Sequence, residues 1–270
     1  MDDGGQQFSL VGKKILVTGG SEGIGRDMAV AFARMGADVA VTARREAKLQ
    51  ETIALIAQAG RKGVSIPCDL QHLPQVERMV ARVYLEMGRL DVLVNNAGAA
   101  VTKPAIEMTE PEWDLQTSVA FRSLFFCSQY VARRMAAHGG GKIINIGSTT
   151  SKSVIEGRSV YGAVKAGVTH LTESLAVEWA RYGILVNTLS PAATVTPSRV
   201  AIMLERPEVR TELLRRIPLG RLAVTHDLMG AAIFFASSAS DFITGQTLFV
   251  DGAGQRPDSH SVLSQAWLSR

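Results

Sequence analysis

Short runs of apolar residues alternate along the chain with longer segments in which apolar residues recur every three or four positions. The short runs are rich in β-branched residues and are apolar on both faces, which is typical of strands in a parallel sheet that helices cover on both sides. Seven such runs occur, at residues 13–18, 38–43, 63–68, 91–96, 141–147, 183–190 and 246–252. The pattern therefore predicts an α/β fold with a doubly wound parallel sheet of about seven strands.

The helical segments fall between these runs and include two long ones, near residues 111–136 and 159–181. No internal repeat or low-complexity linker divides the chain, so we expect a single domain over residues 1–254. Residues 255–270 form a C-terminal tail with several apolar side chains. We expect this tail to pack on a neighbouring subunit or over a lid segment near residues 193–217, a disordered end being the alternative. The apolar side chains of the tail are Val262, Leu263, Trp267 and Leu268.

A glycine-rich stretch, TGGSEGIG at residues 18–25, joins the first predicted strand to the first helix. Small residues there let the backbone approach a phosphate, and the N-terminus of the helix offers free N–H groups and a partial positive charge. The position of this loop predicts a Rossmann-type dinucleotide site. The cofactor-binding residues expected in the loop are Gly19, Ser21, Gly23, Ile24 and Gly25.

Tyr161 and Lys165 are four residues apart in a predicted helix, so their side chains share one face. A phenol is a weak acid, and a nearby cation stabilises its ionised form. The pair is therefore a candidate for general acid–base catalysis, although an ordinary amphipathic turn would give the same spacing.

The TGxxxGxG spacing of the glycines resembles that of the short-chain dehydrogenase/reductase family, and the resemblance covers residues 10–254. Other motifs of the family stand here in order: NNAG at 95–98, Ser148 thirteen residues before Tyr161, the Tyr161–Lys165 pair, and SPAATVTP at 190–197. Within the family, the chain resembles 3-oxoacyl-carrier-protein reductases and gluconate 5-dehydrogenases.

The resemblance implies a catalytic triad of Ser148, Tyr161 and Lys165. Ser148 is expected to hold the substrate oxygen beside the phenol, and Lys165 to bond the nicotinamide ribose as well. It further implies a variable substrate lid near residues 193–217 and a homotetramer built from the two long helices and the last strand. The remaining cofactor contacts that it implies are Asp69 at the adenine, Asn95 of the NNAG motif, Thr196 at the nicotinamide carboxamide, and Thr194.

The residues that follow the second predicted strand bear on the choice between NAD and NADP. An acidic residue there bonds the ribose 2′-hydroxyl, whereas an arginine accepts a 2′-phosphate. This chain has Arg44 and Arg45 and no carboxylate, so we predict NADP with Arg44 as its phosphate ligand, NAD remaining possible. Glu22 in the glycine loop argues against NADP unless its side chain points to solvent.

Two positions depart from the family pattern. Alanine occupies position 192 where the family has glycine after Pro191, so we expect a slightly re-shaped loop. Ala120 occupies the place of a helix asparagine that helps to hold a water beside the lysine. Alanine has no polar side-chain group, so we expect a weakened proton relay with Thr117 as a partial substitute, unless the helix shifts its register.

These observations favour an enzyme that transfers a hydride between NADP(H) and a ketone or secondary alcohol, with Tyr161 as the general acid or base. The alternatives are an NAD-dependent sugar or polyol dehydrogenase and, on the strength of Ala120 alone, an inactive dinucleotide-binding sensor. Arg199, Arg206 and Arg210 in the lid range indicate an acidic or phosphorylated substrate, unless they are only surface residues.

The composition of the chain excludes several classes of binding partner. The 270 residues carry a net charge of +4, but the basic residues are scattered without interleaved aromatic residues, so we expect no nucleic-acid partner. Five dispersed histidines and two distant cysteines, Cys68 and Cys127, give no metal-binding spacing and no disulfide framework. The polar N-terminus and the lack of an apolar run of ~18 residues predict a soluble cytoplasmic protein without a membrane span.

Overall fold

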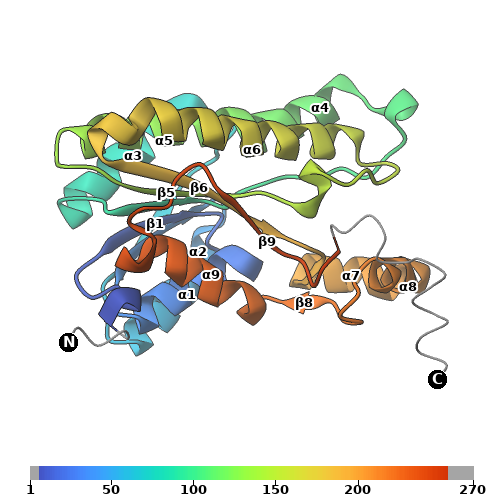
Figure 1. Cartoon of the computed structure of the whole chain (residues 1–270), viewed down its shortest axis with the longest axis horizontal. Coiled ribbons are helices and arrows are strands. Elements are labelled where there is room, and N and C mark those ends of the chain that lie inside the picture. Colours follow the sequence, from blue (N-terminus) through green and yellow to red (C-terminus); the bar gives the residue numbers. More distant parts are fainter. Residues whose placement is uncertain (1–5, 255–270) are drawn as a thin grey trace.

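The computed structural model describes residues 6–254, and the main feature of the chain is one parallel sheet of seven strands (Figure 1). The strand order is β3–β2–β1–β4–β5–β6–β9, and every neighbouring pair runs parallel. The strands are β1 (Lys14–Thr18), β2 (Asp38–Ala43), β3 (Gly63–Pro67), β4 (Val92–Asn95), β5 (Gly141–Ile146), β6 (Ile184–Pro191) and β9 (Thr247–Val250). The predicted doubly wound sheet is confirmed.

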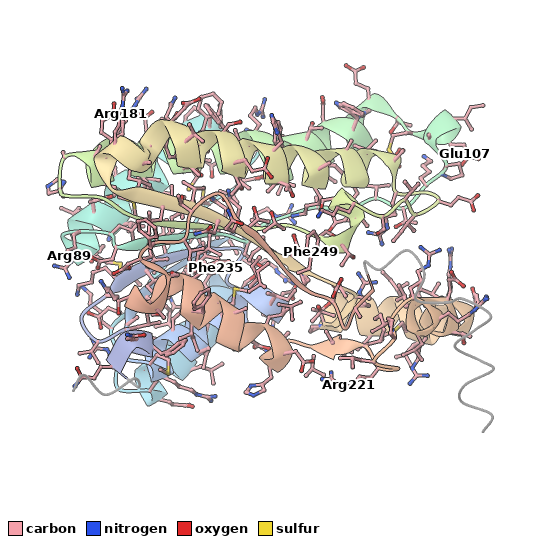
Figure 2. All side chains as sticks on the ribbon, in the orientation of Figure 1. Arg89, Glu107, Arg181, Arg221, Phe235 and Phe249 are labelled. Carbon is pink, nitrogen blue, oxygen red and sulfur yellow. The ribbon has the colours of Figure 1, made fainter. Side chains whose placement is uncertain are left out.

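Helices cover both faces of the sheet, so that the described residues form three layers (Figure 1). One face packs against α1 (Gly23–Arg34), α2 (Glu46–Gln58) and α9 (His226–Ala236), and Phe235 of α9 is buried in this layer (Figure 2). The other packs against α3 (Leu73–Met87), α5 (Ser123–Ala136) and α6 (Ser159–Trp179).

Alternation along β1 explains why the strand is apolar throughout. Ile15 and Val17 point into the core beside α1 and α2, whereas Leu16 points into the core beside α3 and α5. Successive side chains of a strand point to opposite faces, so a strand covered on both sides needs apolar residues at every position.

The side of the sheet to which the chain adds strands changes at β1. Strands β2 and β3 extend the sheet on one side of β1, and β4 then pairs with the other side of β1. In open α/β sheets, such a switch point opens a crevice at the carboxyl ends of the strands, where ligands bind.

The helix predicted near residues 111–136 is interrupted. It consists of α4 (Glu110–Thr117), a π-helical turn at Ser118–Arg122, and α5. A π turn adds one residue to the helical repeat, so an α-helical spacing does not carry across it. The other long helix, α6, lies within one or two residues of the predicted range.

The expected lid range contains two short helices and one short strand that the hydrophobic pattern did not predict. The helices are α7 (Pro197–Glu205) and α8 (Pro207–Arg215), and β7 (Thr194–Val195) pairs with β8 (Ala223–Val224). These elements extend from the sheet on the side where its strands end (Figure 1). The predicted tail at 255–270 lies outside the described residues. Within 6–254, no helix is long and apolar enough to cross a membrane.

A chain of buried polar side chains crosses the centre of the sheet. The Nδ2 of Asn95 donates to Asn145 Oδ1 at 2.9 Å, and Asn145 Nδ2 donates to Thr172 Oγ1 at 2.9 Å. Thr188 Oγ1 donates to the same hydroxyl of Thr172 at 2.8 Å. These bonds tie β4, β5 and β6 to the middle of α6 and thereby fix this helix against the sheet.

We predict that Asn145→Ala destabilises the protein. The change removes two buried hydrogen bonds and leaves one N–H of the Asn95 amide unpaired, and a buried polar group left unpaired costs about 1–3 kcal/mol. Urea unfolding followed by circular dichroism will show a lower midpoint. Ser174→Ala serves as the control, because among residues 6–254 the Ser174 hydroxyl bonds only the His170 carbonyl of its own helix. Equal midpoints for the two variants would contradict a structural role for the network.

Candidate active site

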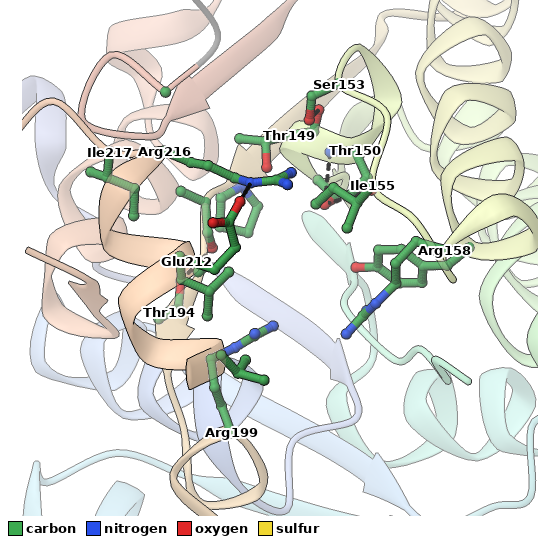
Figure 3. Close-up of a pocket in the computed structure, with 18 of the residues that line it drawn as sticks. Thr149, Thr150, Ser153, Ile155, Arg158, Thr194, Arg199, Glu212, Arg216 and Ile217 are labelled. Atoms are coloured by element: carbon green, nitrogen blue, oxygen red, sulfur yellow. Dashed lines mark hydrogen bonds and ion pairs between the residues drawn. The ribbon is translucent and has the colours of Figure 1, made fainter. Parts of the chain in front are cut away.

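Two adjoining cavities open at the carboxyl ends of the strands. One, of about 470 Å³, lies at the switch point beside the glycine loop and the ends of β2, β3 and β4. The other, of about 860 Å³, lies between the end of β5, the start of α6, and helices α7 and α8 (Figure 3). Tyr161 and Thr196 line both cavities, so Tyr161 stands where the two spaces meet.

The glycine loop is shaped for a close approach of its backbone. Gly19 and Gly23 have φ values of +66° and +59°, in the left-handed region that favours glycine. A Cβ on Gly25 would lie 2.3 Å from both Asn96 Nδ2 and the Gly19 carbonyl oxygen. Asn96 donates through Nδ2 to the carbonyl oxygens of Thr18 at 2.9 Å and Gly19 at 3.2 Å. The residues present thus fit a dinucleotide phosphate at the N-terminus of α1.

Asn96 was missed by the sequence analysis, which selected Asn95 from the same NNAG motif. Asn95 is buried and lines neither cavity, because its amide donates to Ser128 Oγ at 2.8 Å and to Asn145. The alternation of a strand explains the difference, since neighbouring side chains at its end point in opposite directions. Asn96 is the residue of the motif that reaches the loop.

The smaller cavity is lined by three charged side chains from the glycine loop and the end of β2, namely Glu22, Arg44 and Arg45. Arg45 Nη2 lies 2.8 Å from Glu22 Oε2, so the carboxylate that argued against NADP is paired. Arg44 lines the same cavity and forms no ion pair with a described residue. Arg44 is therefore the cation left available for a ligand there.

Asp69 also lines this cavity. Its Oδ1 accepts a hydrogen bond from the Gln71 amide at 3.0 Å, which orients the carboxylate at the end of β3. Ser21 and Ile24 line the cavity too, as the sequence predicted.

Tyr161 and Lys165 lie one turn apart on α6. The ammonium of Lys165 is 5.9 Å from the centre of the Tyr161 ring and donates to the Ile146 carbonyl oxygen at 2.6 Å. Lys165 is 5 % exposed, and this burial lowers its pKa, an effect that the neighbouring Tyr161 opposes. An ionised phenol and a charged ammonium would stabilise one another here.

Ser148 follows the end of β5 and lines the larger cavity together with Tyr161. Its Oγ accepts hydrogen bonds from the Thr150 amide at 3.2 Å and the Thr150 hydroxyl at 2.9 Å. Both bonds leave the proton of the Ser148 hydroxyl free to donate into the cavity.

The two threonines expected to contact the cofactor occupy different places. Thr196 lines both cavities, whereas Thr194 lines only the larger one and donates to the Ala192 carbonyl oxygen at 3.0 Å. Ala192 itself does not require glycine, because Ala253 is the only non-glycine residue with positive φ in the described part of the chain. Left-handed strain at Ala192 is therefore absent.

Position 120 lies in the π turn, where Ala120 is 1 % exposed. The hydroxyl of Thr117 donates to the Trp113 carbonyl oxygen at 3.0 Å, so it is already bonded within its own helix. The expectation that Thr117 replaces the missing asparagine assumed an unbroken α-helix, and the π turn removes that assumption.

Two arginines, Arg158 and Arg199, line the larger cavity together with Tyr161. Arg199 of α7 was a sequence candidate, but Arg206 and Arg210 line neither cavity. Arg158, just before α6, was missed, and its guanidinium carbon lies 5.3 Å from the centre of the Tyr161 ring. Its position three residues before Tyr161, on the same turn of the chain, was the available signal. Within residues 6–254, no group of three or more metal-ligating side chains is present.

Known proteins resemble the chain over most of its length. Residues 19–253 match the family model described as enoyl-(acyl carrier protein) reductase. The 2-dehydro-3-deoxy-D-gluconate 5-dehydrogenase of Dickeya dadantii is 39% identical over 246 residues, which are 91% of this chain and 96% of that protein.

Solved structures of similar proteins support the same family assignment. A putative short-chain alcohol dehydrogenase of Sinorhizobium meliloti is 38% identical with a TM-score of 0.89, covering 92% of this chain and 98% of that one. A gluconate 5-dehydrogenase of Burkholderia cenocepacia, in complex with NADP and tartrate, is 36% identical with a TM-score of 0.87, covering 92% and 96%. The chain therefore belongs to the short-chain dehydrogenase/reductase family and is an oxidoreductase that acts on a secondary alcohol or the corresponding ketone.

Proposed function

We propose that this enzyme uses NADP(H) to interconvert a keto sugar acid and its hydroxy acid, with Tyr161 as the general acid or base. The observation that carries the proposal is the position of Tyr161 at the junction of the two cavities, with Ser148 in the larger and Lys165 in the smaller. A dinucleotide in one cavity and a substrate in the other would meet at this phenol.

The bound nicotinamide dinucleotide supplies or accepts the hydride. In the reductive direction, Ser148 donates a hydrogen bond to the substrate carbonyl oxygen and holds it beside Tyr161. The phenol then gives its proton to that oxygen as the carbonyl carbon gains the hydride, so that a neutral alcohol forms. In the oxidative direction, the ionised phenol removes the alcohol proton.

Lys165 supports both directions from its buried place next to Tyr161. Its charge stabilises the ionised phenol, and its hydrogen bond to the Ile146 carbonyl oxygen holds the ammonium under the ring. Since the site is partly desolvated, this charge interaction is stronger than it would be in water.

The choice of NADP is supported by Arg44, which lines the dinucleotide cavity with no carboxylate partner in the described chain. Pairing of Glu22 with Arg45 offsets the negative charge that would repel a 2′-phosphate. The Burkholderia relative, in complex with NADP, gives independent support. A sugar-acid substrate is supported by the names of the relatives from Dickeya and Burkholderia and by the arginines of the larger cavity.

The finer organisation belongs to the same proposal. Exposed apolar side chains on the two long helical segments support a homotetramer built on them: Trp113 is 49 % exposed, Phe121 36 % and Val177 82 %. Two free, buried cysteines, Cys68 and Cys127, fit a reducing compartment such as the cytoplasm. We propose residues 1–254 as the catalytic domain, with a lid near 193–217, and no nucleic-acid partner.

Tyr161→Phe will abolish turnover while leaving NADPH binding nearly intact. The change removes the oxygen that carries the proton and keeps the ring, and loss of general acid–base catalysis costs roughly 10²–10⁴-fold in rate. Steady-state NADPH oxidation and fluorescence titration of NADPH measure the two effects. Tyr182→Phe, at an exposed position outside both cavities, is the matched control. A near-native kcat in Tyr161→Phe would remove this tyrosine from the mechanism.

Arg44→Ala will weaken NADPH binding much more than NADH binding. A hydrogen bond to a charged group contributes about 1.5–3 kcal/mol, which corresponds to roughly 10–150-fold in Kd. Titration of both dinucleotides into the variant and into Arg34→Ala, an exposed arginine at the end of α1, isolates the 2′-phosphate contact. A wild-type enzyme that prefers NADH would show that the cofactor assignment is wrong.

A further inference from the structure

Arg158 and Arg199 approach the larger cavity from opposite walls. Arg158 precedes the first turn of α6, whereas Arg199 lies on α7, and their guanidinium groups point into the cavity toward one another (Figure 3). Both side chains are half-buried. The Arg158 guanidinium also faces the ring of Tyr161 at 5.3 Å. The space between the two arginines is thus next to the proposed site of proton transfer.

Neither guanidinium forms an ion pair with a carboxylate of the described chain. Of the other two cations that line this cavity, Arg216 pairs with Glu212 at 2.9 Å, whereas Lys152 is exposed to solvent and lies 5.0 Å from the centre of the Phe249 ring. Glu208 lines the cavity but forms no ion pair with either arginine. The contrast with Arg216 identifies Arg158 and Arg199 as charges left without a counter-ion.

The arrangement is electrostatically unfavourable without a ligand. Burial lowers the pKa of Arg199, and the nearby charge of Arg158 lowers it further. Like charges that face each other in a partly desolvated space repel, and an anion placed between them converts that repulsion into two attractions. Guanidinium groups also present paired N–H donors that match the two oxygens of a carboxylate.

We propose that Arg158 and Arg199 form a clamp for an anionic group of the substrate, and that this clamp sets the enzyme's preference for acids over neutral sugars. The inference deepens the proposed function and rests on it for the identity of the substrate. The anion is an oxyanion, with a carboxylate as the expected form and a phosphate as the other source of the same chemistry. Arg158 contributes to the clamp from the residue that precedes α6, and Arg199 contributes from α7 in the proposed lid.

The test compares three ketone substrates that differ at one end only: 5-keto-D-gluconate, L-sorbose and L-sorbose 6-phosphate. L-sorbose has an alcohol in place of the carboxylate of 5-keto-D-gluconate, and its 6-phosphate has a phosphate ester there. The kcat and KM of NADPH oxidation are measured for wild type, Arg158→Ala, Arg199→Ala and Arg199→Lys. The control is Arg210→Ala, which removes an exposed arginine of α8 that lines neither cavity. NADPH affinity is measured for each variant to verify folding and cofactor binding.

We expect each alanine variant to lose roughly 10–150-fold in kcat/KM for the keto acid, mostly through KM, since a charge-assisted contact of this kind is removed. Arg199→Lys retains the charge but not the paired donors, so its loss should be intermediate. Activity on L-sorbose and NADPH affinity should stay close to the wild-type values. A larger loss with L-sorbose 6-phosphate than with the keto acid would assign the clamp to a phosphate.

The outcomes separate this inference from the proposed function. Equal losses on the acid and on L-sorbose, or none on either, would overturn the clamp and leave the oxidoreductase assignment intact. If the wild-type enzyme reduces none of the three ketone substrates, calorimetric titration of tartrate into the enzyme–NADPH complex replaces the kinetic measurement. Tartrate binding that is lost in both alanine variants would then support the clamp while the sugar-acid substrate fails, and binding that persists in them would overturn it.

Discussion

The two hydrogen bonds from Asn96 to the Thr18 and Gly19 carbonyl oxygens join the end of β4 to the start of the glycine loop. Gly19 and Asn96 both line the dinucleotide cavity, so this contact fixes one wall of the crevice at the switch point of the sheet. Gly25 must lack a side chain for the same reason, since a Cβ there would occupy the position of the Asn96 amide. A local contact between two strands thereby determines the shape of the cofactor end of the site.

The catalytic end depends on a different constraint, the fixed position of α6 against the sheet. The buried polar chain through Asn145 and Thr172 ties the middle of this helix to β5 and β6. Lys165 then reaches the carbonyl of Ile146, the last residue of β5. Ser148 follows two residues later. The serine and the tyrosine therefore come from two elements that the polar chain holds in register.

Much of this organisation was predictable from the sequence. All seven main strands follow from apolar runs, because a strand that is covered on both faces needs apolar residues on both. The loop residues Gly19, Gly23 and Gly25 and the pair Tyr161–Lys165 follow from local spacing, which a helix or a turn preserves in three dimensions.

The parts that escaped prediction depend on directions and on long-range contacts. Neighbouring asparagines of the NNAG motif look alike in sequence, and only the pleat of β4 decides that Asn96, and not Asn95, reaches the loop. The π turn at Ser118–Arg122 has no composition signal that distinguishes it from an α-helix. The sequence does not single out Arg158, because its partner Arg199 is 41 positions away and only the folded chain places the two on opposite walls of one cavity.

Helix α7 has no fully buried residue, in contrast to α6, which buries seven of its side chains. A segment held by so few contacts contributes little to the free energy of folding and opens locally at small cost. Substitutions in α7 therefore change the wall of the substrate cavity without disturbing the proton-transfer residues on α6. Over evolutionary time, such a division lets relatives with one chemistry diverge in the compounds that they accept, because selection can act on α7 alone.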